Sequence, residues 1–276
     1  MTHRTSRLIT NILRHLVLIA MSAFAILPFY WMVVTSIKPA SEMMMGPTLI
    51  PKQITFEAYQ HVWSETQFPA WFWNSLKVAV GSTALALLVA CLAGYAMSRY
   101  NFRGKGIFGT TLLMVQMFPL VLVGIPLVLL ISKIGVMDKP FGLVLIYMTF
   151  ALPFAIWMMK GFFDGIPRSL EEAATIDGCS RMQAFRLIVL PLSGPGLTSV
   201  AVFTFLLAWN EFFIAYLFLK TRLTLPIGLL TFIAQFFNQW DSLMSAATLT
   251  TIPVLVFYLI LQRQLTRGIT AGAVKG

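Results

Sequence analysis

The residues able to do chemistry gather in one polar stretch, residues 160–195, and their types favour protein docking over catalysis. Four of the ten acidic residues stand there: Asp164, Glu171, Glu172 and Asp177. The chain has no nucleophile and base pair suited to catalysis. It also lacks a phosphate-binding loop, because Gly104-Lys105-Gly106 has neither the required spacing nor the hydroxyl. The histidines, His3, His15 and His61, are isolated. We therefore expect no catalytic residue and no metal site.

The first half of this stretch predicts a short helix. Ser169 followed by Glu172 matches a capping box, so a helix should begin there, just after Pro167. Gly178 is placed to end the helix, because glycine tolerates the left-handed conformation at a helix C-terminus. The helix should carry its small residues, Ala173 and Ala174, near its start.

The second half predicts another short helix. Ser180 followed by Gln183 is a second capping box, and the helix it opens should run to Leu190 and stop before Pro191. A helix, a glycine and a second helix form a compact knob that a partner protein can approach closely, with Glu172 available to pair with a partner cation. An ordinary solvated hairpin is the alternative.

One acidic residue, Glu211, lies well inside an apolar run. An acidic residue at that depth costs about 2.5–3.5 kcal/mol, so it should face the interior of a helix bundle. On a helix it shares a face with Thr204, Leu207 and Ala215. Neighbouring Trp209 and Asn210, with Thr204 and with Gln116 in an earlier run, offer the hydrogen bonds and the aromatic face that suit a sugar. The alternative is that Glu211 only pairs with a neighbouring helix.

The elements that must position these residues are membrane spans. Apolar residues make up 58% of the 276 and charged residues 11%, against roughly 25% charged in soluble domains. About 20 apolar residues are needed for each helical span. Six runs qualify: 16–37, 75–97, 107–131, 141–159, 196–219 and 243–261. The sequence thus predicts an all-α polytopic membrane protein with six transmembrane helices. Cys91 and Cys179 are expected to be free thiols.

The basic residues predict the orientation. Thirteen of the 20 lysines and arginines fall on one side if both ends of the chain are cytoplasmic, and seven fall on the other. We therefore expect an N-in, C-in topology. Residues 1–15 would be a cytoplasmic segment, and residues 16–276 one six-span domain. The first run resembles a signal peptide near Ala23-Phe24-Ala25, but it continues to Ile37, which is too long for a signal core.

Within that domain the segment 38–74 should be extracytoplasmic, whereas 160–195 and the tail 262–276 should be cytoplasmic. Phe56, Tyr59, Val62 and Trp63 recur at helical spacing and predict a short helix at the membrane surface. The net charge of +10 does not indicate nucleic-acid binding, because the basic residues are scattered between apolar runs.

The motif Glu172-Ala173-Ala174, followed by Gly178 and Ile188-Val189-Leu190-Pro191, resembles the EAA loop of ATP-binding-cassette (ABC) importer permeases. Further segments resemble the carbohydrate branch of that family, and in particular the smaller six-span permease of maltose- and trehalose-type systems. They are Asn74-Ser75-Leu76, Tyr95-Ala96, 99–105, Ala208-Trp209-Asn210-Glu211 and 271–276.

The resemblance implies the type I importer permease fold, in a bacterial cytoplasmic membrane. Its implied partners are a second permease, two ATPase subunits, an extracytoplasmic sugar-binding protein or lipoprotein, the lipid bilayer and the sugar. The chain itself would bind no cofactor, since ATP and Mg belong to the ATPase. The implied coupling residues are Glu172, Ala173, Ala174, Asp177, Gly178, Ile188, Leu190 and Pro191. The implied C-terminal contacts to the ATPase are Val274, Lys275 and Gly276.

Alternative functions remain open from the sequence. A permease of the same fold could carry glycerol phosphate or a polyamine, although a strongly anionic cargo would need cations near the centres of the spans, where the sequence has none. A stand-alone secondary carrier should show more buried ionisable groups and would not need a docking loop. A membrane enzyme would need a catalytic constellation.

Overall fold

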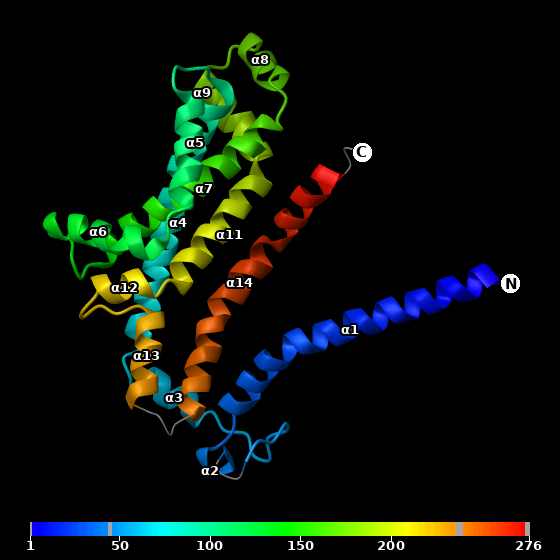
Figure 1. The fold of residues 1–276 in the computed structure, drawn as a ribbon, viewed down its shortest axis with the longest axis vertical. Coiled ribbons are helices and arrows are strands. Elements are labelled where there is room, and N and C mark those ends of the chain that lie inside the picture. Colours follow the sequence, from blue (N-terminus) through cyan, green and yellow to red (C-terminus); the bar gives the residue numbers. More distant parts are fainter. Residues whose placement is uncertain (1, 44–45, 236–239, 274–276) are drawn as a thin grey trace. The chain divides into compact units, whose positions relative to one another are not determined.

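A computed structural model of the chain describes residues 2–43, 46–235 and 240–273, and every regular element among them is a helix. The all-α prediction is confirmed. Figure 1 shows the helices, whose bounds are α1 Thr2–Ser36, α2 Ala40–Met43, α3 Glu57–Ser64, α4 Phe68–Arg99, α5 Lys105–Gln116, α6 Leu120–Lys133, α7 Pro140–Asp164, α8 Ser169–Ile176, α9 Arg181–Ala184, a π-helical turn Phe185–Val189, α10 Leu190–Leu192, α11 Gly194–Asn210, α12 Phe213–Phe218, α13 Leu225–Gln235 and α14 Trp240–Ala273.

Four of the described helices are long and apolar enough to cross a membrane: α1, α4, α7 and α14. Two bent pairs raise the number to as many as six, if each pair is one span. One pair is α5 with α6, bent by 104°, and the other joins residues 181–192 to α11, bent by 74°. The predicted number of spans, six, therefore equals the largest number that the structure supports.

Two of the predicted spans are not continuous helices. In the third predicted run, 107–131, the first helix, α5, ends at Gln116, and a second helix, α6, begins at Leu120. Pro119, which precedes α6, lacks an N–H and disfavours helical geometry in the residue before it. In the fifth predicted run, 196–219, α11 ends at Asn210, and α12 begins at Phe213. Apolar composition alone does not distinguish one long helix from two shorter ones.

The chain divides into two compact units, Met1–Phe68 with Leu229–Thr251, and Pro69–Gly228 with Ile252–Gly276. The larger unit carries the polar stretch. In it α7 packs against α5 and α11, and α6 packs against α12. A buried cluster that includes Met97, Met159, Phe163, Phe185 and Val200 joins α4, α7, the π turn and α11. The polar stretch is therefore built on a packed helical base.

The smaller unit contains the predicted short helix of the 38–74 segment. It is confirmed as α3, in which Ala58 and Val62 are buried while Trp63 is exposed. Before α3, the carboxylate of Glu42 in α2 accepts hydrogen bonds from the N–H groups of Lys52 and Gln53 in the loop that follows α2. Burial alone would raise the pKa of Glu42, but these bonds hold it below its ordinary value. Glu42 thus fixes the loop as an ionised carboxylate.

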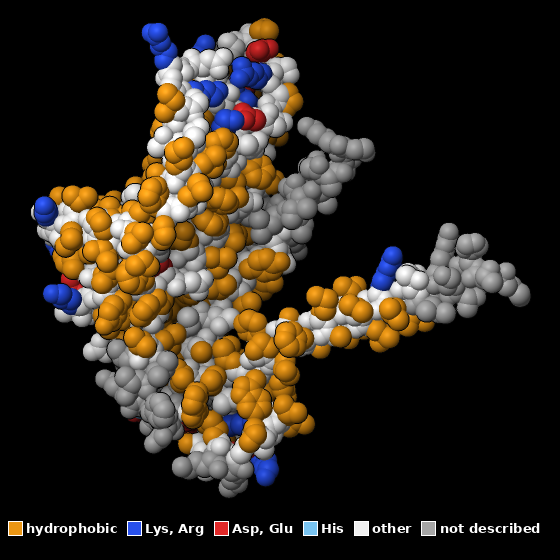
Figure 2. Space-filling model, in the orientation of Figure 1, with side chains coloured by type: hydrophobic (Ala, Val, Ile, Leu, Met, Phe, Trp, Pro, Cys, Tyr) orange, Lys and Arg blue, Asp and Glu red, His pale blue; other side chains and the backbone are white. Residues whose placement is uncertain are grey.

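The first helix presents an apolar surface. Residues 10–30 of α1 are all exposed, and most of them are apolar. Figure 2 shows hydrophobic side chains covering the described part of α1. An exposed apolar helix of this length needs lipid or protein around it rather than water.

One carboxylate joins two loops of the larger unit. Asp138, between α6 and α7, accepts hydrogen bonds from the Lys220 and Thr221 N–H groups at 2.7 and 2.9 Å. It also accepts one from the Thr221 hydroxyl at 2.5 Å. Burial opposes ionisation, but the hydrogen bonds, led by the Thr221 hydroxyl, lower the pKa of Asp138 from 3.8 to about 2.

Replacing this carboxylate, as in Asp138→Asn, is expected to destabilise the protein at neutral pH but not at pH 2. The pKa is lower in the folded state, so the stabilisation is complete above about pH 4 and is lost as pH falls from 3.8 towards 2. The half-exposed position limits the loss at pH 7 to about 1 kcal/mol. Thermal unfolding in detergent at several pH values measures this loss of stability. Asp177→Asn, a change at an exposed aspartate, is the control. A pH-independent difference would contradict the prediction.

Candidate functional site

The polar stretch forms a helical hairpin at one end of the larger unit. α8 and α9 are separated by residues 177–180, where Gly178 has φ +91°. The N–H of Cys179 bonds to the Ala174 carbonyl at 2.9 Å, which satisfies a carbonyl at the end of α8. Ser180 and Gln183 form a reciprocal capping box at the start of α9. The predicted glycine turn and the second capping box are confirmed.

The first predicted capping box is wrong. α8 begins at Ser169, as expected, but the residue before it, Arg168, is the N-cap and makes no side-chain cap bond. Arg168 already has helical angles, φ −64° and ψ −28°, so Ser169 lies one position inside the helix and its hydroxyl cannot cap it. The arginine side chain instead reaches the Ser98 carbonyl at 3.0 Å.

The second helix does not stop before Pro191. A π-helical turn, Phe185–Val189, follows α9, and α10 then carries the chain through Pro191 to Leu192. The Leu190 N–H bonds to the Phe185 carbonyl, five residues back. Pro191 stands at the start of α10, directly after the π-helical turn, and has no N–H to donate to a carbonyl of that turn. The helical segment therefore ends at Ser193.

The predicted coupling residues divide by exposure. Glu172, Ala173, Asp177, Gly178 and Pro191 are exposed, Ile188 and Leu190 are half-buried, and Ala174 is buried. Four exposed apolar side chains that the sequence did not single out also lie on the hairpin: Leu170, Ile176 (86% exposed), Met182 and Leu187. The signal in the sequence for such a side chain is an apolar residue inside a polar loop, as at Ile176. The hairpin therefore presents both acidic and apolar groups to a partner.

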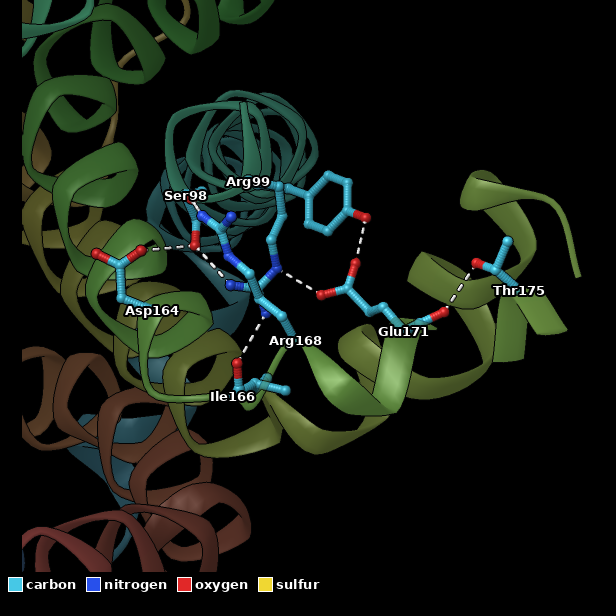
Figure 3. A network of polar contacts seen from close by, with 8 residues as sticks. Ser98, Arg99, Asp164, Ile166, Arg168, Glu171 and Thr175 are labelled. Atoms are coloured by element: carbon cyan, nitrogen blue, oxygen red, sulfur yellow. Dashed lines mark hydrogen bonds and ion pairs between the residues drawn. The ribbon is translucent and has the colours of Figure 1, made fainter. Parts of the chain in front are cut away.

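A polar network fastens the hairpin to the end of α4 (Figure 3). Glu171 in α8 accepts a hydrogen bond from Arg99 Nε at 2.5 Å and one from the Tyr95 hydroxyl at 2.5 Å. Arg99 also donates to the Ile166 carbonyl at 3.0 Å. The side chains of Arg99 and Glu171 are only 8% and 14% exposed. The sequence reasoning missed both roles, although a cation at the end of an apolar run was a signal for Arg99.

The same network extends to α7. Ser98 donates to Asp164 at 2.6 Å and receives a hydrogen bond from Arg99. Asp164 also pairs with Lys160 at 2.5 Å within α7. A cavity of about 480 Å³ lies beside the network and is lined by residues that include Tyr100, Arg168, Glu172 and Arg181. Arg168 and Arg181 are also exposed. Figure 2 shows basic side chains gathered at the end of the larger unit that carries α8 and α9.

Glu211 lies at the break between α11 and α12 and not on a continuous helix. Its carboxylate accepts the N–H groups of Ile214 and Ala215 at 2.8 and 3.1 Å and so caps α12. It also accepts a hydrogen bond from the buried hydroxyl of Tyr147 in α7 at 2.5 Å. The helical face that the sequence predicted across Thr204 and Ala215 is wrong, because the extended backbone of Glu211 (ψ 125°) ends α11.

The other predicted pathway residues lie in different settings. Thr204 is fully buried, and its hydroxyl has no hydrogen-bond partner among the described residues. Trp209 is buried and stacks on Phe205, with ring centroids 5.6 Å apart. Asn210 and Gln116 are exposed, each at the end of a helix that precedes a break. The predicted C-terminal contacts Val274, Lys275 and Gly276 lie outside the described residues.

Comparisons with known proteins place these features in a wider group. The sequence model of a family described as "Binding-protein-dependent transport system inner membrane component" matches residues 82–271. The chain is 37% identical to the trehalose transport system permease protein SugB of Mycobacterium tuberculosis, over 92% of this chain and 93% of that protein. It is 36% identical to the diacetylchitobiose uptake system permease protein DasC of Streptomyces coelicolor, over 91% of this chain and 92% of that protein.

A solved structure shares the fold. A chain of a bacterial ABC transporter involved in the import of the acidic polysaccharide alginate superposes with a TM-score of 0.82 at 23% identity. The match covers 95% of this chain and 98% of that one. The predicted ABC importer permease fold is therefore confirmed.

Proposed function

The chain belongs to the binding-protein-dependent transport system inner membrane component family, and on this premise we propose that it is one of two permease subunits of an ATP-driven sugar importer. As a member of that family it is a multi-pass inner-membrane transport protein and not an enzyme. We propose that its partners are a second permease, two cytoplasmic ATPase subunits and an extracytoplasmic sugar-binding protein.

The observation that carries this proposal is the α8–α9 hairpin. It exposes Glu172 and Ala173 beside the apolar side chain of Ile176, and it stands on a packed helical base. Exposed apolar groups on a rigid element suit a protein partner better than water, and a carboxylate beside them offers charge complementarity to that partner. We propose that this hairpin docks on an ATPase and that Val274, Lys275 and Gly276 add a second contact.

Docking on an ATPase would also fix the orientation. ATP is cytoplasmic, so the hairpin within 160–195 would face the cytoplasm. The excess of basic residues on that side, 13 against seven, supports the same topology, with both chain ends inside. The segment 38–74, including α3, would then face the sugar-binding protein.

We propose a disaccharide or short oligosaccharide such as trehalose or maltose as the cargo. Relatives named for trehalose and diacetylchitobiose transport support the disaccharide class. Polar side chains at helix breaks support a pathway there: Gln116 at the α5–α6 break, and Asn210 with Glu211 at the α11–α12 break. Broken helices beside polar groups are typical of solute pathways in transporters. Buried Thr204 and Trp209 would support the wall of that pathway.

The test is ATP hydrolysis by the reconstituted complex in lipid vesicles, with binding protein loaded with trehalose, maltose or diacetylchitobiose and glycerol 3-phosphate as a non-sugar comparison. We expect one sugar to stimulate hydrolysis and import. Glu172→Lys should reduce the stimulation at least tenfold, since a reversed charge in a docking surface costs about 1.4 kcal/mol or more. Arg103→Glu, a reversal of an exposed charge outside the hairpin, is the matched control and should change it little. Sugar transport by the chain alone, or stimulation only by glycerol 3-phosphate, would contradict the proposal.

A further inference from the structure

We propose that the Arg99–Glu171 ion pair is the link that transmits movement of the docking hairpin to the membrane helix α4. This inference rests on the proposed function, because it assigns a task to the pair only if the hairpin docks on an ATPase. Arg99 and Glu171 are then positioning residues. Neither belongs to the exposed surface of the hairpin.

Along the backbone, bends connect the hairpin to the helices on either side of it, α7 and α11. Residues 165–168 separate α7 from α8, and Ser193 marks the 74° bend between α10 and α11. Arg99, at the end of α4, is 72 residues from Glu171, and α5, α6 and α7 separate α4 from the hairpin along the chain. A movement of α8 therefore reaches α4 through side chains.

The side chains that join α8 to α4 are polar and directional. Glu171 uses both carboxylate oxygens, one for Arg99 and one for the Tyr95 hydroxyl. The two terminal nitrogens of Arg99 donate hydrogen bonds to the Ile166 carbonyl and to Ser98 Oγ, both at 3.0 Å. The guanidinium thus holds the α7–α8 turn and α8 together against one end of α4 (Figure 3).

Burial makes the Arg99–Glu171 pair costly to separate. An exposed ion pair rearranges readily in water and transmits little. Here both side chains are nearly buried, so separating them would strand charges away from water. Lys160–Asp164 offers the contrast, because it lies within α7 alone, and the Asp164 side chain is 43% exposed. The buried pair should therefore move as a unit with the hairpin.

The test separates transmission from simple stability. A single change such as Arg99→Met leaves a lone buried charge and endangers folding, whereas the double variant Arg99→Met/Glu171→Gln removes both charges together. In the reconstituted complex, with the sugar that stimulates the wild type most strongly, we expect the double variant to bind its ATPases. Its number of sugars imported per ATP hydrolysed should fall at least tenfold. The control Lys160→Met breaks only the pair within α7 and leaves the Ser98–Asp164 hydrogen bond between α4 and α7 in place, so it should keep the wild-type ratio.

A second variant tests the link even if the double variant does not assemble. Arg99→Lys keeps the charge but loses the planar fork that reaches Glu171, Ile166 and Ser98 at once, so the ratio should fall about threefold or more. A wild-type ratio in either assembled variant would overturn the inference. If the wild type itself shows no sugar-stimulated hydrolysis, the proposed function fails, so the two failures are distinguishable.

Discussion

Gly178→Val is expected to reduce sugar import at least tenfold while the membrane helices stay folded. Gly178 has φ +91°, a conformation that costs a residue with a Cβ roughly 1–2 kcal/mol and a β-branched residue more. No atom lies within 4 Å of the position where its Cβ would be, so the effect is backbone strain and not a clash. The turn between α8 and α9 should rearrange to relieve that strain, which would misplace the surface proposed to dock.

The measurement is import together with retention of the ATPases on the purified complex. Gly135→Val is the matched control, because Gly135 also has a positive φ, +73°, and open space around its Cβ position, but lies in the α6–α7 loop. We expect the control to unfold slightly earlier than the wild type and to keep its import. Wild-type import by Gly178→Val, or an equal loss in Gly135→Val, would show that the hairpin turn has no special part in coupling.

Gly94→Val is expected to destabilise the larger unit by about 3 kcal/mol or more. Gly94 lies where α4 approaches α7, and a Cβ there would stand 2.9 Å from Met159 Cβ and 3.0 Å from the Lys160 backbone nitrogen. The Ile156 carbonyl oxygen would be 3.2 Å away. Backbone atoms cannot move aside as a flexible side chain can, so the two helices must separate. Small residues are what permit such close approach between membrane helices.

Thermal unfolding in detergent, followed by size-exclusion chromatography, measures this loss. Gly161→Val in α7 is the control, because no atom lies within 4 Å of its Cβ position. Gly94→Val should unfold at a clearly lower temperature or fail to accumulate, whereas Gly161→Val should resemble the wild type. Equal unfolding temperatures for Gly94→Val and the wild type would mean that α4 and α7 are not packed as described.

The local sequence determined the features whose physical cause is local. A run of apolar residues long enough to cross a bilayer predicts a helix wherever it stands, and α4 and α7 contain the predicted runs. Gly178 and the Ser180–Gln183 capping box act within a few residues of themselves, so their geometry could be predicted. The EAA-type motif likewise lies within one segment, and the family that it suggested is the family whose model matches.

Only the tertiary structure decided which distant groups meet. Arg99 and Glu171 are 72 residues apart, and Tyr147 and Glu211 are 64 apart, so no local pattern pairs them. The break at Glu211 was missed for the same reason: its carboxylate finds the N–H groups of α12 and the Tyr147 hydroxyl, and that set of bonds competes with a continuous helix. Ser169 failed as a cap because Arg168, which reaches back to α4, already has helical backbone angles. Composition fixes where helices can form, whereas the buried polar partners fix where they end and what they hold.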